Sequence, residues 1–282
     1  MILVTGASGQ LGRLVIHSLL EKTDASHIIA AVRNPDSVKD LAEKGVQVRH
    51  ADYAQPDTLV SAFAGVEKLL LISSSEVGQR TPQHTNVINA AKEAGVSLIA
   101  YTSILQAVSS PLALAAEHIE TEKRLAESDV PYVLLRNGWY SENYTANIGM
   151  ALEHGAVLGS AGEGKFSTAS RVDYAEAAAV VLTSDNQAGK VYELAGDNAF
   201  TLTEYASAIS KESGTTVVYQ NLPETEYAQV LTQVGLPEGL ATILANSDIG
   251  ASKGGLFNDS KTLSTLIGRP TTSIEDSIKA AL

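Results

Sequence analysis

Three glycines stand at positions 6, 9 and 12, between a short apolar segment and a segment with leucines at helical spacing. Glycine has no Cβ, so backbone N–H groups at the start of a helix can approach a phosphate closely. Ile2–Thr5 has the pattern of a buried strand, and residues 11–19 have the pattern of an amphipathic helix. The spacing, Gly-x-x-Gly-x-x-Gly, is one residue longer than the commonest dinucleotide-binding motif. Strand, turn and helix together predict a pyrophosphate-binding turn, with a simple glycine-rich turn as the alternative.

The residue that ends the second expected strand distinguishes NAD from NADP. An acidic side chain there would bind the ribose 2′-hydroxyl and repel a 2′-phosphate. This chain has Arg33 at that place, and residues 28–32 contain no carboxylate. A guanidinium pairs with phosphate in a forked geometry, so Arg33 favours NADP(H) unless it is an ordinary solvated arginine. Asp52, after the third expected strand, either binds the adenine amino group or forms a turn.

Polar and aromatic residues follow the fourth, fifth and sixth expected strands. In a parallel sheet such positions share one edge, where the nicotinamide half of the cofactor would bind. The candidates there are Ser73, Ser74, Ser75, Tyr101, Asn137, Gly138, Trp139 and Tyr140. Segment 136–144 holds the only tryptophan and two of the ten tyrosines. An aromatic wall of this kind suits a flat apolar substrate, and packing between two lobes is the alternative.

The acid–base pair Tyr-x-x-x-Lys is absent at every tyrosine. In the helix expected after the fifth strand, Lys123 stands where the lysine of that pair would be, and Ile119 replaces the tyrosine. Carbonyl–alcohol chemistry needs a proton donor beside the oxygen, so we do not expect a conventional alcohol dehydrogenase. Lys123 either binds the nicotinamide ribose or is an exposed helix lysine paired with Glu120 or Glu122.

Composition and charge exclude several functional classes. A formal net charge of −12 argues against a nucleic-acid partner. The absence of cysteine excludes disulfides and thiolate chemistry, and the six histidines show no metal-ligand spacing, so no metal site is expected. No apolar run could span a bilayer, and the first residues do not have the pattern of a secretory signal. We therefore expect a cytoplasmic protein with no membrane association.

Expected strands and helices alternate along the first half of the chain, which is typical of βαβ crossovers and a parallel sheet. The predicted fold class is α/β, a doubly wound Rossmann sheet of order 3-2-1-4-5-6 with a smaller C-terminal α/β lobe. We expect an NADP-binding domain over 1–136 and a mainly substrate-binding lobe over 137–282, some of whose segments return to the sheet. The four glycines of segment 155–166 suggest turns or a hairpin.

Six motifs together resemble the NmrA-like branch of atypical short-chain dehydrogenases, and within it a quinone-reducing type. The resemblance extends over essentially the whole chain. The motifs are Thr5–Gly12, Ala31–Pro35, Leu71–Ser75, Ala100–Ser103, His118–Lys123 and Leu135–Tyr140.

The resemblance implies a flavin-free, NADPH-dependent reductase whose smaller lobe closes over the substrate. By position it also implies a set of cofactor contacts. These come from Gly6, Ser8, Gly9, Gln10, Leu11, Arg33, Ser73, Ser74, Ser75, Arg80, Tyr101, Lys123, Asn137, Gly138, Trp139 and Tyr140.

Two functional hypotheses follow. In the first, the protein delivers hydride from NADPH to a quinone-like small molecule, and Asn143, Tyr144 or water stabilises the developing oxyanion. Quinol oxygens are more acidic than alcohols, so the missing tyrosine acid matters less for this reaction. In the second, the protein binds NADP(H) as a redox sensor without turnover. A homodimer is left open.

Overall fold

A computed structural model describes all residues 1–282, which divide by their contacts into two units. The first unit comprises 1–104, 116–137 and 171–192, and the second comprises 105–115, 138–170 and 193–282. The sequence-based division at 136/137, with later segments returning to the sheet, remains a prediction about functional domains. No helix has the length and apolar character needed to cross a membrane.

The main sheet has seven strands in the order β3-β2-β1-β4-β5-β6-β8. This confirms the predicted order for the first six strands and adds β8 at the edge beside β6. Neighbouring strands from β3 to β6 pair in parallel, with Ile2 opposite Ile28 and Ile99 opposite Tyr132. The strands are β1 (Ile2–Val4), β2 (Ile28–Val32), β3 (Gln47–His50), β4 (Lys68–Leu71), β5 (Leu98–Ile104), β6 (Tyr132–Asn137) and β8 (Val191–Leu194).

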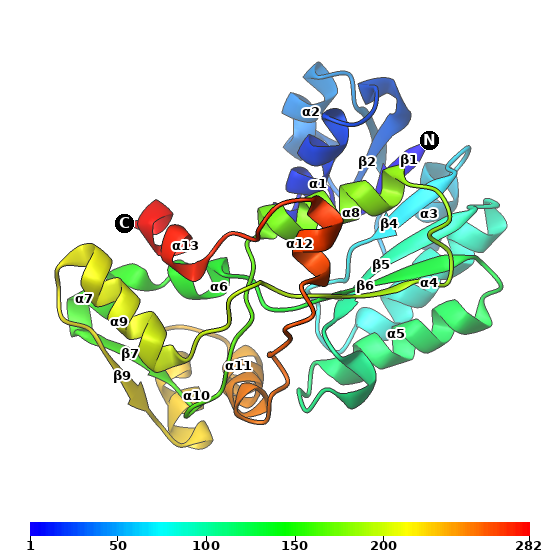
Figure 1. Ribbon diagram of the computed structural model, residues 1–282. Coiled ribbons are helices and arrows are strands. Elements are labelled where there is room, and N and C mark those ends of the chain that lie inside the picture. The colour runs from blue at the N-terminus through cyan, green and yellow to red at the C-terminus, as the bar shows by residue number, and fades with distance from the viewer. The chain divides into compact units, whose positions relative to one another are not determined.

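Helices cover both faces of this sheet (Figure 1). Helix α1 packs against α8 on one face, and α3 packs against α4 on the other. The α-helices of this part of the chain are α1 (Gln10–Leu20), α2 (Lys39–Glu43), α3 (Pro56–Ala62), α4 (Arg80–Glu93), α5 (Ala115–Glu127) and α8 (Arg171–Thr183). Short 3₁₀ turns occur at η1 (Ala25–His27), η2 (Pro35–Val38) and η3 (Ala107–Ser109).

Strand residues alternate between these two helical layers. Leu69, Leu70 and Leu71 of β4 are all inaccessible to solvent, because one layer covers the odd-numbered side chains and the other covers the even-numbered ones. One core cluster joins the odd-numbered residues of β1, β4 and β5 to side chains of α3, α4 and α5. The apolar run of β4 is therefore buried on both faces of the sheet.

The second unit contains a small sheet of two parallel strands, β7 (Ala156–Gly159) and β9 (Val218–Asn221). The hairpin suggested for segment 155–166 is therefore wrong, because β7 pairs with a strand far along the chain rather than with its neighbour. The glycines do form turns: Gly155 ends α7 in the left-handed region with φ of 65°. The helices of this unit are α6 (Glu142–Thr145), α7 (Ile148–His154), α9 (Leu202–Ser213), α10 (Glu224–Gln233), α11 (Glu238–Ser252), α12 (Thr262–Ile267) and α13 (Ile274–Ala281).

Candidate functional site

The glycine turn after β1 leaves backbone donors free at the start of α1. A Cβ on Gly12 would lie 2.4 Å from the carbonyl oxygen of Gly6, so only glycine permits this tight approach. Gly6 itself has φ of +58°, in the left-handed region that glycine adopts without strain. Gly9 caps α1 without any side-chain hydrogen bond, and the first turn of the helix holds no acidic residue. Unpaired N–H groups and the positive end of the helix dipole fit a pyrophosphate.

Arg33 lies one residue beyond β2, beside this turn. The Ala7 N–H donates to the Ala31 carbonyl at 3.3 Å, which holds the glycine turn against the end of β2. The Arg33 side chain is 71% exposed and forms an ion pair with Glu76 at 3.1 Å. The other oxygen of Glu76 accepts a hydrogen bond from Gln83 Nε2 at 2.8 Å. An accessible guanidinium at this edge of the sheet fits the 2′-phosphate of NADP.

Asp52 forms the turn that was one of its two predicted roles. Its Oδ1 accepts from the Ala54 N–H at 2.9 Å, and its Oδ2 accepts from Gln55 Nε2 at 3.0 Å. An adenine contact of Asp52 stays a prediction.

Side chains of other strands and helices fix the loop of Ser73, Ser74 and Ser75 after β4. The Ser73 N–H donates to Thr102 Oγ1 at 2.8 Å, and Arg80 Nε donates to the Ser74 carbonyl at 2.6 Å. The Ser74 N–H donates to His84 Nε2 at 2.9 Å. Burial lowers the pKa of His84 to about 3, so this ring is neutral and can accept. The loop is thereby held rigid at the edge of the sheet that was predicted to bind the cofactor.

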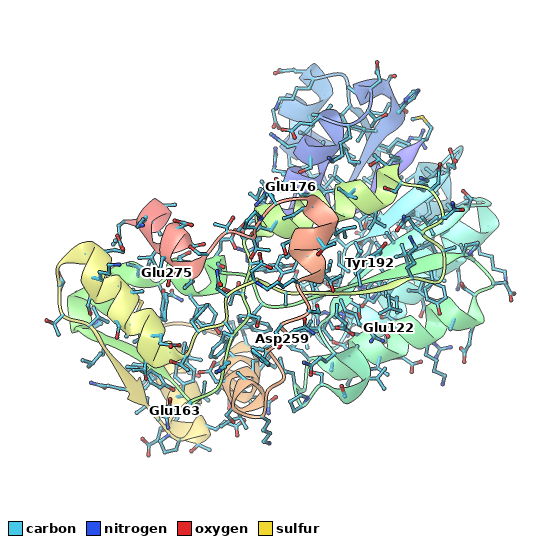
Figure 2. The ribbon with its side chains drawn as sticks, in the orientation of Figure 1. Glu122, Glu163, Glu176, Tyr192, Asp259 and Glu275 are labelled. Atoms are coloured by element: carbon cyan, nitrogen blue, oxygen red, sulfur yellow. The ribbon has the colours of Figure 1, made fainter.

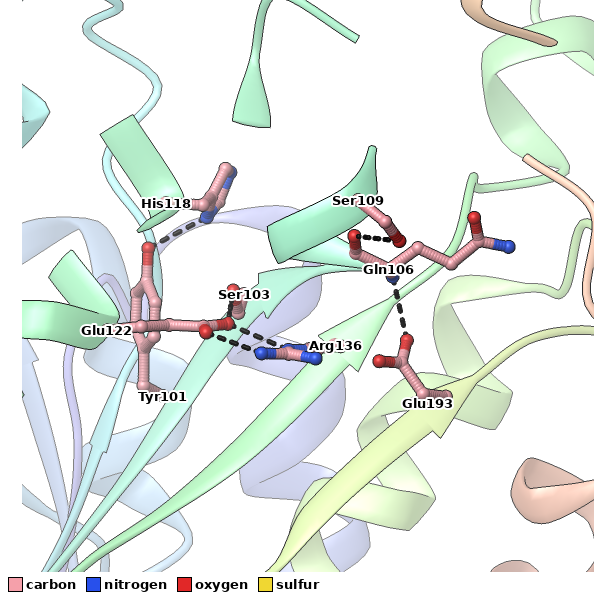
Figure 3. A network of polar contacts seen from close by, with 8 residues as sticks. All are labelled: Tyr101, Ser103, Gln106, Ser109, His118, Glu122, Arg136 and Glu193. Carbon is pink, nitrogen blue, oxygen red and sulfur yellow. Dashed lines mark hydrogen bonds and ion pairs between the residues drawn. The ribbon is translucent and has the colours of Figure 1, made fainter. Parts of the chain in front are cut away.

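Tyr101 does not lie on the surface of this edge. Its side chain is completely buried in the core, and its hydroxyl lies 2.7 Å from His118 Nδ1 (Figure 3). Burial lowers the pKa of His118 to about 3, with a smaller contribution from the Arg80 charge, and burial also raises the pKa of Tyr101. The ring of Tyr101 is thus enclosed in the core, and a cofactor contact of this residue stays a prediction. His118 is therefore a structural residue of the core.

Lys123 is exposed on α5 and pairs with neither predicted carboxylate. Arg124 holds Glu120 at 2.9 Å, and Arg136 holds Glu122 through bonds of 2.9 and 2.6 Å (Figure 3). The pairing alternative for Lys123 is therefore wrong, and its ammonium group is left free for a ligand. A ribose contact remains a prediction.

The end of β6 continues into the aromatic segment of the second unit. Asn137 ends the strand, and its buried Oδ1 accepts no hydrogen bond from the protein. The Gly138 N–H donates to the Leu194 carbonyl at 2.7 Å, and Tyr140 forms an isolated bridge with Ala169. These backbone bonds fix the course of the chain that leads into α6.

A cavity of about 540 Å³ lies within the second unit. Trp139, Asn143 and Tyr144 line it, so the structure brings together three residues that the sequence analysis singled out. Tyr144 packs edge-on against the rings of Phe166, at 5.4 Å between centroids, and Tyr205, at 5.7 Å. Size and lining suit a flat aromatic molecule.

Three further cavity residues, Tyr205, Tyr227 and Asp248, were missed in the sequence. Burial raises the pKa of Asp248 to about 6, although the Ser160 N–H works in the opposite direction. Burial is the main cause that raises the pKa of Tyr144 and Tyr227, and the negative charge of Asp248 adds to the effect. One feature of the sequence could have identified Asp248. It is a carboxylate at helical spacing from Ala241, Ala245 and Ala251, so it lies on the apolar, buried side of α11.

Comparisons with known proteins agree with this geometry. The chain is 62% identical over 278 residues to quinone oxidoreductase 2 of Escherichia coli, covering 99% of this chain and 97% of that protein. A crystal structure of the E. coli NADPH-dependent quinone oxidoreductase with NADPH matches with a TM-score of 0.98, 61% identity and 99% coverage of both chains. The triphenylmethane reductase of Citrobacter sp. with NADP(H) matches with a TM-score of 0.96, 41% identity and full coverage of both chains. A model of the NmrA-like family matches residues 1–277, and the chain belongs to that family.

Proposed function

We propose that this protein is a flavin-free, NADPH-dependent oxidoreductase that transfers hydride to a quinone or a similar flat aromatic electrophile. The observation that carries the proposal is the 62% identity, over nearly the whole chain, to the E. coli quinone oxidoreductase. The free N–H groups of the glycine turn and the exposed Arg33 guanidinium give this chain the groups that NADPH binding needs.

The residues of the first unit bind and orient the cofactor. The backbone of Gly6, Ser8, Gly9, Gln10 and Leu11 would hold the pyrophosphate, and Arg33 the 2′-phosphate. The loop of Ser73–Ser75 and the ammonium group of Lys123 would hold the ribose and carboxamide end. NADPH supplies the hydride when bound. Catalysis then depends mostly on proximity and orientation.

Residues of the cavity would bind the acceptor and stabilise charge on it. Tyr144 stays protonated because burial raises its pKa, so its hydroxyl can donate a hydrogen bond to a developing oxyanion. Asn143 can donate through its side-chain amide, and Trp139 offers a flat apolar surface.

The rival hypothesis is a redox sensor that binds NADP(H) without turnover, and the identity to a quinone oxidoreductase favours the enzyme. A cytoplasmic location and a homodimer stay predictions. Analytical ultracentrifugation of the purified chain tests the second of these.

The experiment mixes purified protein, free of flavin by its visible spectrum, with NADPH and benzoquinone, and follows the absorbance of the reduced nicotinamide. We expect catalysed oxidation over many turnovers, with NADPH preferred over NADH. Stoichiometric binding of NADPH without turnover on any of several quinones would refute the enzyme and support the sensor.

A further inference from the structure

A single carboxylate lies in the wall of the cavity of the second unit. Asp248, on α11, is only 8% exposed, and its Oδ2 accepts a hydrogen bond from the Ser160 N–H at 2.7 Å. Its Oδ1 accepts no hydrogen bond from the protein. A Cβ on Gly159 would lie 2.7 Å from Oδ2, so the absence of a side chain there leaves room for the carboxylate. The backbone thus fixes one carboxylate oxygen and leaves the other free.

The cavity contains no lysine or arginine to neutralise this charge. The other ionisable groups in its lining are His154 on α7 and the hydroxyls of Tyr144, Tyr205 and Tyr227. The remaining lining residues are apolar side chains and the amides of Asn143, Asn147 and Gln220, with Trp139 as a further aromatic. A ligand in this space meets a carboxylate surrounded mainly by aromatic and aliphatic groups.

A second polar atom of the cavity also has no partner. Tyr205, which is 3% exposed, has a buried hydroxyl that makes no hydrogen bond to the protein. Leaving a buried hydroxyl unsatisfied is costly, and such groups are rare in folded proteins. The Tyr205 hydroxyl is inaccessible to solvent, so the unpartnered polar atom that a ligand in the cavity can reach is the free oxygen of Asp248.

We propose that Asp248 determines acceptor specificity: its Oδ1 accepts a hydrogen bond from a donor substituent on the aromatic acceptor, and its charge excludes acceptors with anionic substituents. This inference rests on the proposed function, because it assigns the cavity to the acceptor. Asp248 is a binding residue here and takes no part in moving hydride.

The test compares three naphthoquinones that carry a methyl, a hydroxymethyl or a carboxymethyl group at the same ring position. Values of kcat/KM are measured for the unmodified protein, for Asp248→Asn and for a control, Glu275→Gln. Glu275 is an exposed carboxylate of the same unit, on α13 and outside the cavity lining (Figure 2). Differences in redox potential among the quinones are the same for all three proteins and cancel in the comparison.

We expect the unmodified protein to prefer the hydroxymethyl over the carboxymethyl compound. The Asp248→Asn variant should lower that preference by about 10- to 100-fold, the range of a hydrogen bond to a charged group. Asparagine can still accept from the Ser160 N–H, so the fold is preserved. Glu275→Gln should leave the preference unchanged. An unchanged preference in Asp248→Asn overturns the inference.

Calorimetry with naphthalenemethanol and naphthalenesulfonate, which accept no hydride and keep their charges throughout the pH range used, separates this inference from the proposed function. Tighter binding of the alcohol that is lost in Asp248→Asn supports the role of Asp248 even if no quinone is reduced. If the variant does not fold, the same pair is compared on the unmodified protein well below and well above the Asp248 pKa of about 6. The discrimination should then shrink in acid, and equal discrimination at both pH values overturns the inference.

Discussion

Charge reversal at Arg33 should abolish the preference for NADPH over NADH. A guanidinium about 4 Å from a phosphate contributes about 1 kcal/mol per unit charge in water, and about 4 kcal/mol at an effective dielectric constant near 20. The Arg33 side chain is 71% exposed, so the lower value applies. The 2′-phosphate carries nearly two charges, and an aspartate replaces attraction by repulsion. Arg33→Asp should therefore cost about 3 to 4 kcal/mol, or a loss of roughly 100- to 1,000-fold in NADPH affinity.

The assay is calorimetric titration of Arg33→Asp with NADPH and with NADH, at low and at raised ionic strength. NADH affinity should change only a few-fold, and salt should narrow the difference between the unmodified protein and the variant. Lys92→Asp is the control, because it makes the same change in net charge at another exposed site, where Lys92 pairs with Asp129 at 3.1 Å. If the ratio of the two affinities in Arg33→Asp stays within about threefold of its original value, the assignment of the 2′-phosphate to Arg33 is refuted.

Three further predictions concern the first unit. In Gly12→Ala the new methyl group would meet backbone atoms of the same turn at 2.4 Å, so we expect a loss of about 1 to 3 kcal/mol in stability and of measurable NADPH binding, checked by thermal unfolding and calorimetry; unchanged binding would contradict the tight turn. Arg136→Met leaves the Glu122 carboxylate, 10% exposed, without its cation and should cost about 3 to 5 kcal/mol in urea unfolding, whereas a change below about 1 kcal/mol would mean that the pair is solvated. The pKa of both His84 and His118 lies near 3 in the folded state, against 6.5 in the unfolded chain. Between pH 6.5 and pH 3 these two rings therefore bind protons only in the unfolded chain. The free energy of unfolding should fall with decreasing pH by about 1.4 kcal/mol per pH unit for each ring. His118→Gln should remove about half of that slope, and an unchanged slope would show that the ring is protonated in the folded protein.

Local pattern was sufficient for the fold of the first half of the chain. The glycine turn, the order of the first six strands and the position of Arg33 all depend on residues close together in sequence and on the regular geometry of βαβ units. The same regularity explains the apolar run of β4, because helices cover both faces of the sheet and bury every side chain of the run. Side-chain orientation was not predicted: alternation along β5 turns the ring of Tyr101 into the core.

Pairing between distant segments could not be predicted in the second half. Strand β7 forms its sheet with β9, which follows some sixty residues later, and no local signal specifies such a partner. Likewise, the local pattern did not predict the ion pairs of α5. Glu120 pairs with Arg124, and Glu122 pairs with Arg136 of β6, so neither carboxylate pairs with Lys123.

The sequence by itself determined the parallel sheet, the glycine turn at the start of α1 and the place of Arg33 just after β2, because each is encoded within one strand–turn–helix unit. Only the tertiary structure decided which side chains share the cavity of the second unit. Asp248 and Tyr144 are more than a hundred residues apart, and they line one cavity because α6, α7, β7, β9 and the helices α9 to α11 fold together. Burial in that cavity, rather than residue type, then gives the carboxyl group a pKa near 6.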